Sequence, residues 1–308
     1  MLLARIAGNR TASCAALLYL VAGSASFAGA QQAPKSRAPV PRTIILPVKM
    51  VVGAPATLAV LDAAGRLLPG VVVVLSTGQK VTTDATGRAL IAALAEQGKL
   101  LATVQGRPGQ EISATSPVMA TPDSTAATSV DGLPGGVRVE SYPRALTLHD
   151  RFTIEGTGFR GVADSNHVFL SDQPCLVVAS SPVSLVVLPG PHIAIGENYL
   201  QVSVSGHDTA QFPVSAISLE FSGPSEAPDA GTQGKIILSV HGATERLAVE
   251  VFNGSPGIIQ FPHGNVQRLT TSGGDQNIAP VELKFLAAGN YTVTARLIPN
   301  DAGSPASK

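Results

Sequence analysis

The sequence predicts an all-β protein built from tandem β-sandwich domains, and two observations support that prediction. Short apolar or alternating segments recur along the chain, and turn sequences containing Gly, Pro, Asp or Asn separate them. The 31 Gly and 23 Pro residues amount to about one residue in six, which suits a fold with many turns between short strands.

The composition excludes several classes of protein. Charged residues make up 14% of the chain and hydrophobic residues 44%, so the chain does not lack the side chains that form a core. The 21 basic and 21 acidic residues balance, which argues against a nucleic acid or an acidic membrane surface as the partner.

The first 30 residues have the features of a secretory signal peptide. Arg5 and Arg10 form a positive start, and a ten-residue apolar stretch, Cys14–Gly23, follows. An Ala-Gly-Ala cleavage sequence at 28–30 places the new N-terminus at Gln31. A membrane anchor is the alternative, but the apolar stretch is shorter than the ~20 residues that span a bilayer. We expect export to the periplasm, the medium or the cell surface, with no transmembrane segment after cleavage.

Cleavage of the signal peptide would change the net charge of the chain and the number of its cysteines. It removes Arg5 and Arg10 and leaves 19 basic against 21 acidic residues, a formal charge of −2. It also removes Cys14, so Cys175 is the single remaining thiol and no intramolecular disulfide can form. We expect Cys175 to be a buried, unreactive thiol.

Changes in composition divide the chain into strand-rich segments and polar connections. The expected parts are a signal peptide at 1–30, a disordered leader at 31–42, β-sandwich domains at 43–115, 137–216 and 217–300, a linker at 116–136 and a tail at 301–308.

The first strand-rich segment carries two similar turns. Asp62-Ala-Ala-Gly65 and Asp84-Ala-Thr-Gly87 each place Asp at the start of a turn and Gly where a positive φ is needed. The β-branched run Val71–Leu75 predicts a strand covered on both faces. The sequence at 89–99 could form a short helix, but we expect a strand and a turn because the apolar segment LLATV resumes at once.

The same segment resembles the carboxypeptidase-regulatory-like and bacterial immunoglobulin-like sandwich modules, which implies a fold and no active site. The residues that carry the resemblance are Val60, Asp62, Gly65, Pro69-Gly70-Val71 and Thr83-Asp84-Ala85-Thr86-Gly87-Arg88.

In the second segment, strand alternation predicts which side chains are buried. Val137 and Val139 are expected to point inward, with Arg138 and Glu140 outward. Gly156 and Gly158 together provide a bend that a side chain would obstruct. The expected core partners are Phe152, Ile154, Phe159 and Phe169.

This second segment resembles the IPT/TIG domain, an immunoglobulin-like β-sandwich. The residues that carry the resemblance are Pro143, Phe152-Thr-Ile154, Glu155-Gly-Thr-Gly-Phe159, Val168, Pro174, Leu185-Val-Val187, Pro189, Gly196 and Leu200-Gln-Val202.

The third segment predicts another immunoglobulin-like β-sandwich without a closer family resemblance. VELKF at 281–285 and YTVTARL at 291–297 alternate apolar and polar residues, so each half-buries one sheet face. The Ala287–Asn290 connection predicts a hairpin between them.

No motif in the sequence indicates a catalytic, metal or cofactor site. The His149-Asp150 pair has no nucleophile that the sequence can place beside it. The histidines lie singly, without metal-binding spacing, at 149, 167, 192, 207, 241 and 263. The turns at 164–166 and 274–277 could supply oxygen ligands to calcium, but both are ordinary turn sequences.

The composition also bears on two polymeric ligands, DNA and polysaccharide. The segment 137–216 has four arginines against seven acidic residues, which argues against DNA. A sugar site based on stacking would need exposed aromatic side chains, but Trp is absent and the mature chain has only Tyr142, Tyr199 and Tyr291.

We therefore expect an exported, non-enzymatic protein that acts in binding, adhesion or as a spacer, with an unidentified extracellular or envelope protein or polysaccharide as partner. One alternative is a polysaccharide-binding accessory protein, which exposed tyrosines would favour. The other is an unrecognised hydrolase, which a pocket gathering histidine and carboxylate side chains would favour.

Overall fold

The computed structural model describes residues 43–104, 111–120, 136–224, 226–227 and 229–298. Regular structure in these residues is β-strand apart from one short 3-10 turn, η2 (Ala163–Ser165), which confirms the all-β prediction. The expected signal peptide at 1–30, leader at 31–42 and tail at 301–308 lie outside the described residues, as do residues 121–135 of the expected linker.

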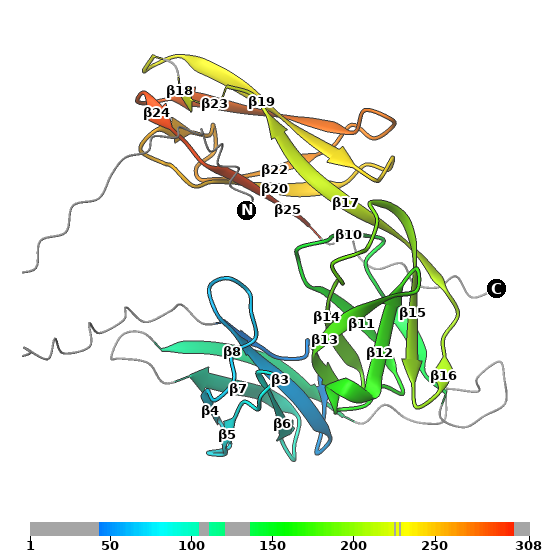
Figure 1. Cartoon of the computed structure of the whole chain (residues 1–308). Coiled ribbons are helices and arrows are strands. Elements are labelled where there is room, and N and C mark those ends of the chain that lie inside the picture. Colours follow the sequence, from blue (N-terminus) through cyan, green and yellow to red (C-terminus); the bar gives the residue numbers. More distant parts are fainter. Residues whose placement is uncertain (1–42, 105–110, 121–135, 225, 228, 299–308) are drawn as a thin grey trace, which may run out of the picture. The chain divides into compact units, whose positions relative to one another are not determined.

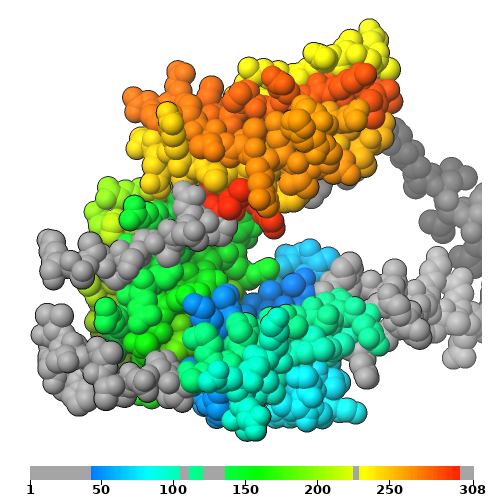
Figure 2. Space-filling view, turned by 180° about the vertical axis from the view of Figure 1, so that it is seen from behind, coloured from blue at the N-terminus to red at the C-terminus, as the bar shows by residue number. Residues whose placement is uncertain are grey.

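The strands form three β-sandwiches that follow one another along the chain (Figure 1). Figure 2 is coloured by residue number, and each sandwich is a region of continuous colour there because each is built from one stretch of chain. We name them the first sandwich (β1–β8), the second sandwich (β9 to the first half of β17) and the third sandwich (the second half of β17 to β25).

The first sandwich has one sheet in the order β1-β3-β6 and another in the order β2-β8-β7-β4-β5. Leu58 and Val60 of the smaller sheet share a buried core with Val73 and Leu100 of the larger one. The strands are β1 (Thr43–Ile45), β2 (Met50–Val51), β3 (Pro55–Leu61), β4 (Val72–Leu75), β5 (Lys80–Thr82), β6 (Arg88–Ala92), β7 (Gly98–Val104) and β8 (Ile112–Met119).

Both predicted Asp-Gly turns are confirmed, as is the strand and turn expected at 89–99. The Asp62 carboxylate accepts the backbone N–H of Ala64 at 2.8 Å, and the Asp84 carboxylate accepts that of Thr86 at 2.8 Å. Gly65 has φ +77° and Gly87 has φ +72°, the left-handed backbone that glycine adopts without strain.

Two expectations for the first sandwich are wrong. Val71–Leu75 is not a strand covered on both faces, because the outer face of its sheet is open and Val72 is 49% exposed. The strand buried on both faces is β3, in which every residue from Ala56 to Leu61 is buried. The expected linker also begins later than residue 116, because β8 continues to Met119 and buries Val118 in the core.

The second sandwich buries most of the side chains that its sequence predicts. Val139, Phe152, Ile154 and Phe159 lie in one core cluster, whereas Phe169 does not. Phe169 is half-buried on the opposite face, because its neighbours Val168 and Leu170 take the inward positions of the strand. The strands are β9 (Arg138–Ser141), β10 (Ala145–Thr147), β11 (Phe152–Thr157), β12 (Asn166–Leu170), β13 (Gln173–Ser181), β14 (Ser184–Leu188), β15 (Gly196–Val204), β16 (His207–Asp208) and β17 (Phe212–Ser222).

The bend expected at Gly156 and Gly158 is confirmed. The pairing of β11 with β9 shifts register at Gly156, where an added Cβ would lie 2.0 Å from the carbonyl oxygen of Arg138. Gly158 has φ +81°.

The third sandwich packs a sheet in the order β17-β19-β23-β21 against a sheet in the order β22-β20-β25. Phe261 and Phe285 lie in the core between them with Val249 and Val251. The strands that follow β17 are β18 (Glu226–Ala227), β19 (Gln233–His241), β20 (Ala248–Asn253), β21 (Ile259–Gln260), β22 (Val266–Thr270), β23 (Ile278–Phe285), β24 (Gly289–Asn290) and β25 (Val293–Leu297).

The alternation expected in β23 and β25 is confirmed, but the hairpin expected between them is wrong. β23 pairs with β19 and β21, whereas β25 pairs with β20 in the opposite sheet. The connection at 287–290 therefore crosses from one sheet to the other, and within it β24 pairs with β18.

Strand β17 belongs to two sandwiches. Its first half pairs with β15, from Phe212 to Ala216, and its second half pairs with β19, from Ser218 to Ser222 (Figure 1). The change of partner occurs at Ile217, so the boundary expected between residues 216 and 217 coincides with it. The strand itself continues through this boundary without a break. A buried cluster that includes Ile217, Val240 and Leu247 surrounds this point.

The two Asp-Gly turns lead to a prediction about stability. Replacing Gly87 by Ala should lower the free energy of unfolding by about 2 kcal/mol or more, because φ is positive and the new Cβ would lie 2.7 Å from the backbone nitrogen of Leu68. Gly78→Ala is the matched control, with φ +84° and no atom within 4 Å of the new Cβ, and should cost about 1 kcal/mol. Urea denaturation measures both, and equal losses would contradict the steric explanation.

Candidate functional site

The histidines of the second and third sandwiches do not gather in one place. Each side chain is exposed, and His241 alone among the described histidines lies near a carboxylate, with its Nε2 3.5 Å from Glu220. Asp150, beside His149, accepts a hydrogen bond from the hydroxyl of Thr147 at 2.6 Å. Within the described ranges, no three His, Cys, Asp or Glu side chains are arranged to hold a metal ion.

The two turns considered for calcium use their amide side chains to hold the fold. The Asn166 Oδ1 accepts the backbone N–H of Arg160 at 2.8 Å, and its Nδ2 donates to the carbonyls of Arg160 and Val162. Asn277 is buried and donates to the carbonyls of Ala243 and Glu245.

The tyrosines divide between core and surface. Tyr142 is buried, and its ring lies 5.1 Å from that of Phe212. Tyr291 packs edge-on against Phe285. Tyr199 lies on the surface of the second sandwich, where it is 43% exposed and its hydroxyl donates to Glu197 at 3.1 Å.

Cys175 is half-buried and packs against the core of the second sandwich. Burial raises the pKa of the Cys175 thiol, so the thiol stays protonated at neutral pH. It lines a hollow of about 240 Å3 together with Arg88, Asp164, His167 and Phe169, among others. A raised pKa disfavours the thiolate, which is the form in which a cysteine reacts.

A long-range contact joins the first and second sandwiches. The outer face of β1 and β3 packs against the outer face of β13 and β14, and β3 pairs with β13 at Thr57 and Ser180. The apolar centre of this contact, which we call the junction, consists of Ile45, Ala59, Leu61, Val178, Ala179 and Val186.

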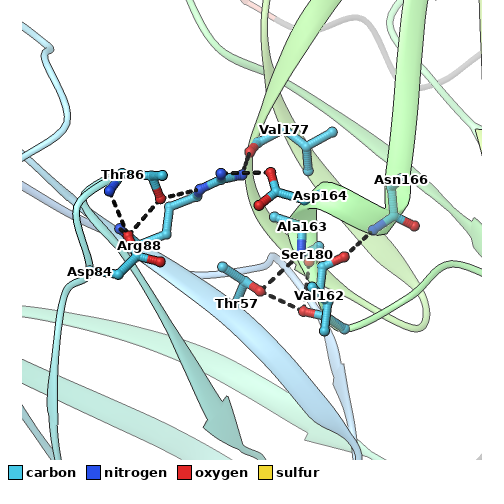
Figure 3. A network of polar contacts seen from close by, with 11 residues as sticks. Thr57, Asp84, Thr86, Arg88, Val162, Ala163, Asp164, Asn166, Val177 and Ser180 are labelled. Atoms are coloured by element: carbon cyan, nitrogen blue, oxygen red, sulfur yellow. Dashed lines mark hydrogen bonds and ion pairs between the residues drawn. The ribbon is translucent and has the colours of Figure 1, made fainter.

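Two hydroxyls at the junction meet on a single carbonyl. The Thr57 hydroxyl donates to the carbonyl oxygen of Gly161 at 2.6 Å, and the Ser180 hydroxyl donates to the same oxygen at 2.8 Å (Figure 3). The Thr57 oxygen also accepts the backbone N–H of Ala163. A side chain at Gly161 would obstruct this approach, because its Cβ would lie 2.0 Å from the carbonyl oxygen of Pro55.

Arg88 reaches across the junction from the first sandwich (Figure 3). Its side chain is 8% exposed, and it donates to the carboxylate of Asp164 at 2.6 Å and to the carbonyl of Val177 at 3.1 Å. Its Nε donates to the hydroxyl of Thr86, so three nitrogens of the buried guanidinium have partners.

A second polar contact lies beside Lys49. Its ammonium group pairs with Glu155 of the second sandwich at 2.7 Å. Its backbone carbonyl accepts hydrogen bonds from the hydroxyls of Ser181 and Ser184, which are both buried. No local pattern in the sequence indicates this contact or that of Arg88, because the partners lie 76 or more residues apart.

The third sandwich carries a shallow hollow of about 570 Å3 over β19, β21 and β23. Lys235 lies opposite Glu282 in the strand register, so opposite charges face each other in the hollow. The residues that line it are Gln233, Gly234, Lys235, Gln260, Phe261, Pro262, Glu282, Leu283 and Lys284.

Comparison with protein families confirms the resemblance stated for the second segment. Residues 141–221 match the model of the IPT/TIG domain family. The match covers 81 of the 308 residues and ends within β17. The resemblance of residues 43–115 to carboxypeptidase-regulatory-like modules stays a prediction. No curated protein matches the chain significantly in sequence.

Several solved structures show a distant likeness. SGBP-B of the Bacteroides ovatus mixed-linkage glucan utilization locus, in complex with a mixed-linkage heptasaccharide, is 13% identical with a TM-score of 0.28, covering 81% of this chain and 74% of that one. The extracellular region of plexin A4, domains 1 to 8, is 12% identical with a TM-score of 0.31, and the match covers 84% of this chain but 33% of that one. The fibronectin(III)-like modules of Clostridium thermocellum CbhA are 12% identical with a TM-score of 0.19, covering 57% of this chain and 92% of that one.

The junction predicts unequal roles for two arginines in similar turns. Arg88→Ala should lower the free energy of unfolding by about 3 kcal/mol, because it leaves the Val177 carbonyl without its charged donor inside the junction. Arg66→Ala is the matched control, because Arg66 follows the other Asp-Gly turn but its side chain is 80% exposed. That change should cost about 0.5 kcal/mol. Thermal and urea unfolding measure both losses, and a small effect of Arg88→Ala would contradict the role given to the junction.

Proposed function

We propose that this chain is an exported, non-enzymatic protein whose immunoglobulin-like β-sandwiches act in binding, adhesion or as an extracytoplasmic spacer. The observation that carries the proposal is the way the sandwiches are connected. Strand β17 runs from one sandwich into the next without a break, and the first and second sandwiches share a buried junction.

These connections favour a chain that holds its sandwiches in fixed positions. Relative motion of the first and second sandwiches would expose Ala59 and Leu61 to water and leave the Arg88 side chain without its partners. Relative motion of the second and third would bend β17 at Ile217, which is 1% exposed. Fixed spacing suits a protein that displays a binding surface at a distance from an attachment point.

Export is supported by the first 30 residues of the sequence. In the part of the chain that the structure describes, no helix has the length and apolar character needed to cross a membrane. We place the mature protein in the periplasm or outside the cell, where its partner is an extracellular or envelope protein or a polysaccharide.

A polysaccharide-binding accessory role is the second candidate. The exposed ring of Tyr199 favours it, because a planar ring on the surface can stack against a sugar. The third candidate, an unrecognised hydrolase, has less support because the described histidines lie apart on the surface.

Distance measurements between spin labels test the spacer proposal. Cysteines that replace Lys80, His207 and Lys284 report on the three sandwiches in a Cys175→Ser background. The 80–207 and 207–284 distance distributions should be as narrow as that of a control pair inside the third sandwich, Lys284 and Thr294. Broad distributions for the pairs between sandwiches would contradict fixed spacing.

Export has a separate test. When the full chain is expressed in a bacterium that has a periplasm, the exported protein should begin at Gln31, as measured by intact mass. Ala30→Arg should block cleavage because the cleavage site requires small residues, whereas the control Ala30→Ser should not. An exported product that keeps residues 1–30 in the unsubstituted chain would be inconsistent with a signal peptide.

A further inference from the structure

The outer face of the sheet β22-β20-β25 carries a group of charges that the packing of the third sandwich does not require. Alternate residues of β20 point to opposite faces of the sheet, so Val249 and Val251 enter the core. Glu250 and Phe252 therefore lie on the outer face. In the strand register, Glu250 stands directly between Arg268 of β22 and Arg296 of β25.

Glu250 holds both arginines. Its Oε1 accepts the Nε–H of Arg268 at 2.8 Å, and its Oε2 accepts the Nε–H and an Nη–H of Arg296 at 2.8 and 2.5 Å. The Arg296 guanidinium also lies 5.1 Å from the centre of the Phe252 ring. These contacts fix the direction in which each guanidinium points.

The carboxylate is covered while the guanidinium groups stay accessible. The Glu250 side chain is 7% exposed, but those of Arg268 and Arg296 are 78% and 64% exposed. Hydrogen bonds from Arg296 and then Arg268 hold the pKa of the Glu250 carboxyl below its usual range, so it stays ionised at neutral pH. One negative charge between two positive ones leaves the face with a net positive charge.

The charge of this face differs from that of the segment around it. Residues 217–300 contain five basic and seven acidic residues, yet Glu250 is the single acidic residue in the sequences of β20, β22 and β25. Two of the three arginines in the segment lie on this face. The third, Arg246, bonds to the carbonyl of Ser272 just beyond the end of β22.

The geometry favours a ligand with several carboxylates along an extended chain. A guanidinium binds a carboxylate through two parallel hydrogen bonds, and a guanidinium already fixed in direction loses less entropy on binding. The backbones of Arg268 and Arg296 stand two strand spacings apart, roughly 10 Å, and both guanidinium groups turn inward to the one carboxylate of Glu250. The N–H groups that Glu250 does not occupy lie on either side of it and can contact neighbouring carboxylates of one polymer. The hydroxyls of Thr270 and Thr294 lie on exposed positions of the same strands.

An acidic polysaccharide fits this face better than an acidic protein does. Protein interfaces depend on buried aromatic or aliphatic anchors. Here Phe252 is half-buried beneath Arg296, and Val266 is the exposed large hydrophobic residue of these three strands.

We propose that Arg268 and Arg296 bind the uronate carboxylates of an acidic polysaccharide on the outer face of β22, β20 and β25, with Glu250 as the residue that positions them. This proposal goes beyond the spacer function and rests on the charge and register of one sheet. The binding proposal can therefore be wrong while the spin-label distances support fixed spacing. Equally, it can be right while those distances contradict fixed spacing.

Titration calorimetry of the mature chain with polygalacturonate oligomers tests the proposal. We expect binding that weakens with added salt, and no binding to the neutral polymer dextran. Arg268→Ala and Arg296→Ala should each weaken binding by roughly tenfold to a hundredfold, the loss expected for hydrogen bonds between charged groups. Lys284→Ala removes an exposed cation from the other sheet and should leave binding unchanged.

Glu250→Gln separates positioning from simple charge attraction. This change makes the face more positive, so binding by charge alone would become tighter. Loss of the positioning carboxylate should instead weaken binding, and Arg268→Lys should recover only part of the wild-type affinity. Two results with the variants would overturn the proposal: tighter binding by Glu250→Gln, or a loss of affinity in Lys284→Ala as large as that in Arg268→Ala. Two results with the ligands would also overturn it: no binding of polygalacturonate, or equal binding of poly-glutamate.

Discussion

The burial of β3 on both faces is the constraint on which the arrangement of the first two sandwiches depends. Its inward residues Leu58 and Val60 complete one core, and its outward residues Ala59 and Leu61 complete the junction with the second sandwich. Without the second sandwich, β3 would expose apolar side chains to water. The polar contacts around the junction supply partners for the groups that this burial removes from water, with Arg88 as the most buried charge among them.

Continuity of strand β17 explains how the second and third sandwiches are held together. Strand β17 pairs first with β15 and then with β19, which joins the second sandwich to the third. Within the second sandwich, β13 likewise pairs first with β12 and then with β14, which joins its two sheets. One long strand can serve two sheets because its hydrogen-bonding edges meet different partners along its length. The same backbone bonds that stabilise each sheet then also fix the connection between them.

Within the described residues, a sheet face that no other strand covers is a place where the molecule can meet a partner. The outer face of the β22-β20-β25 sheet combines a covered carboxylate with two accessible guanidinium groups, an arrangement that costs desolvation of Glu250 and leaves positive charge at the surface. At Asn166 and Asn277, by contrast, polar contacts satisfy buried side chains.

The sequence by itself determined the strand-rich class, the Asp-Gly turns, the bend at Gly156 and the IPT/TIG resemblance, because each depends on neighbouring residues and on strand alternation. Only the tertiary structure decided that β3 is the strand buried on both faces, that the 287–290 connection crosses to the other sheet, and that Phe169 lies on the face opposite the core. The clearest case is the pair of similar turns, D-A-A-G-R and D-A-T-G-R. Arg66 stays exposed while Arg88 is buried, because Asp164 and Val177, which meet Arg88, lie more than 70 residues away in the chain.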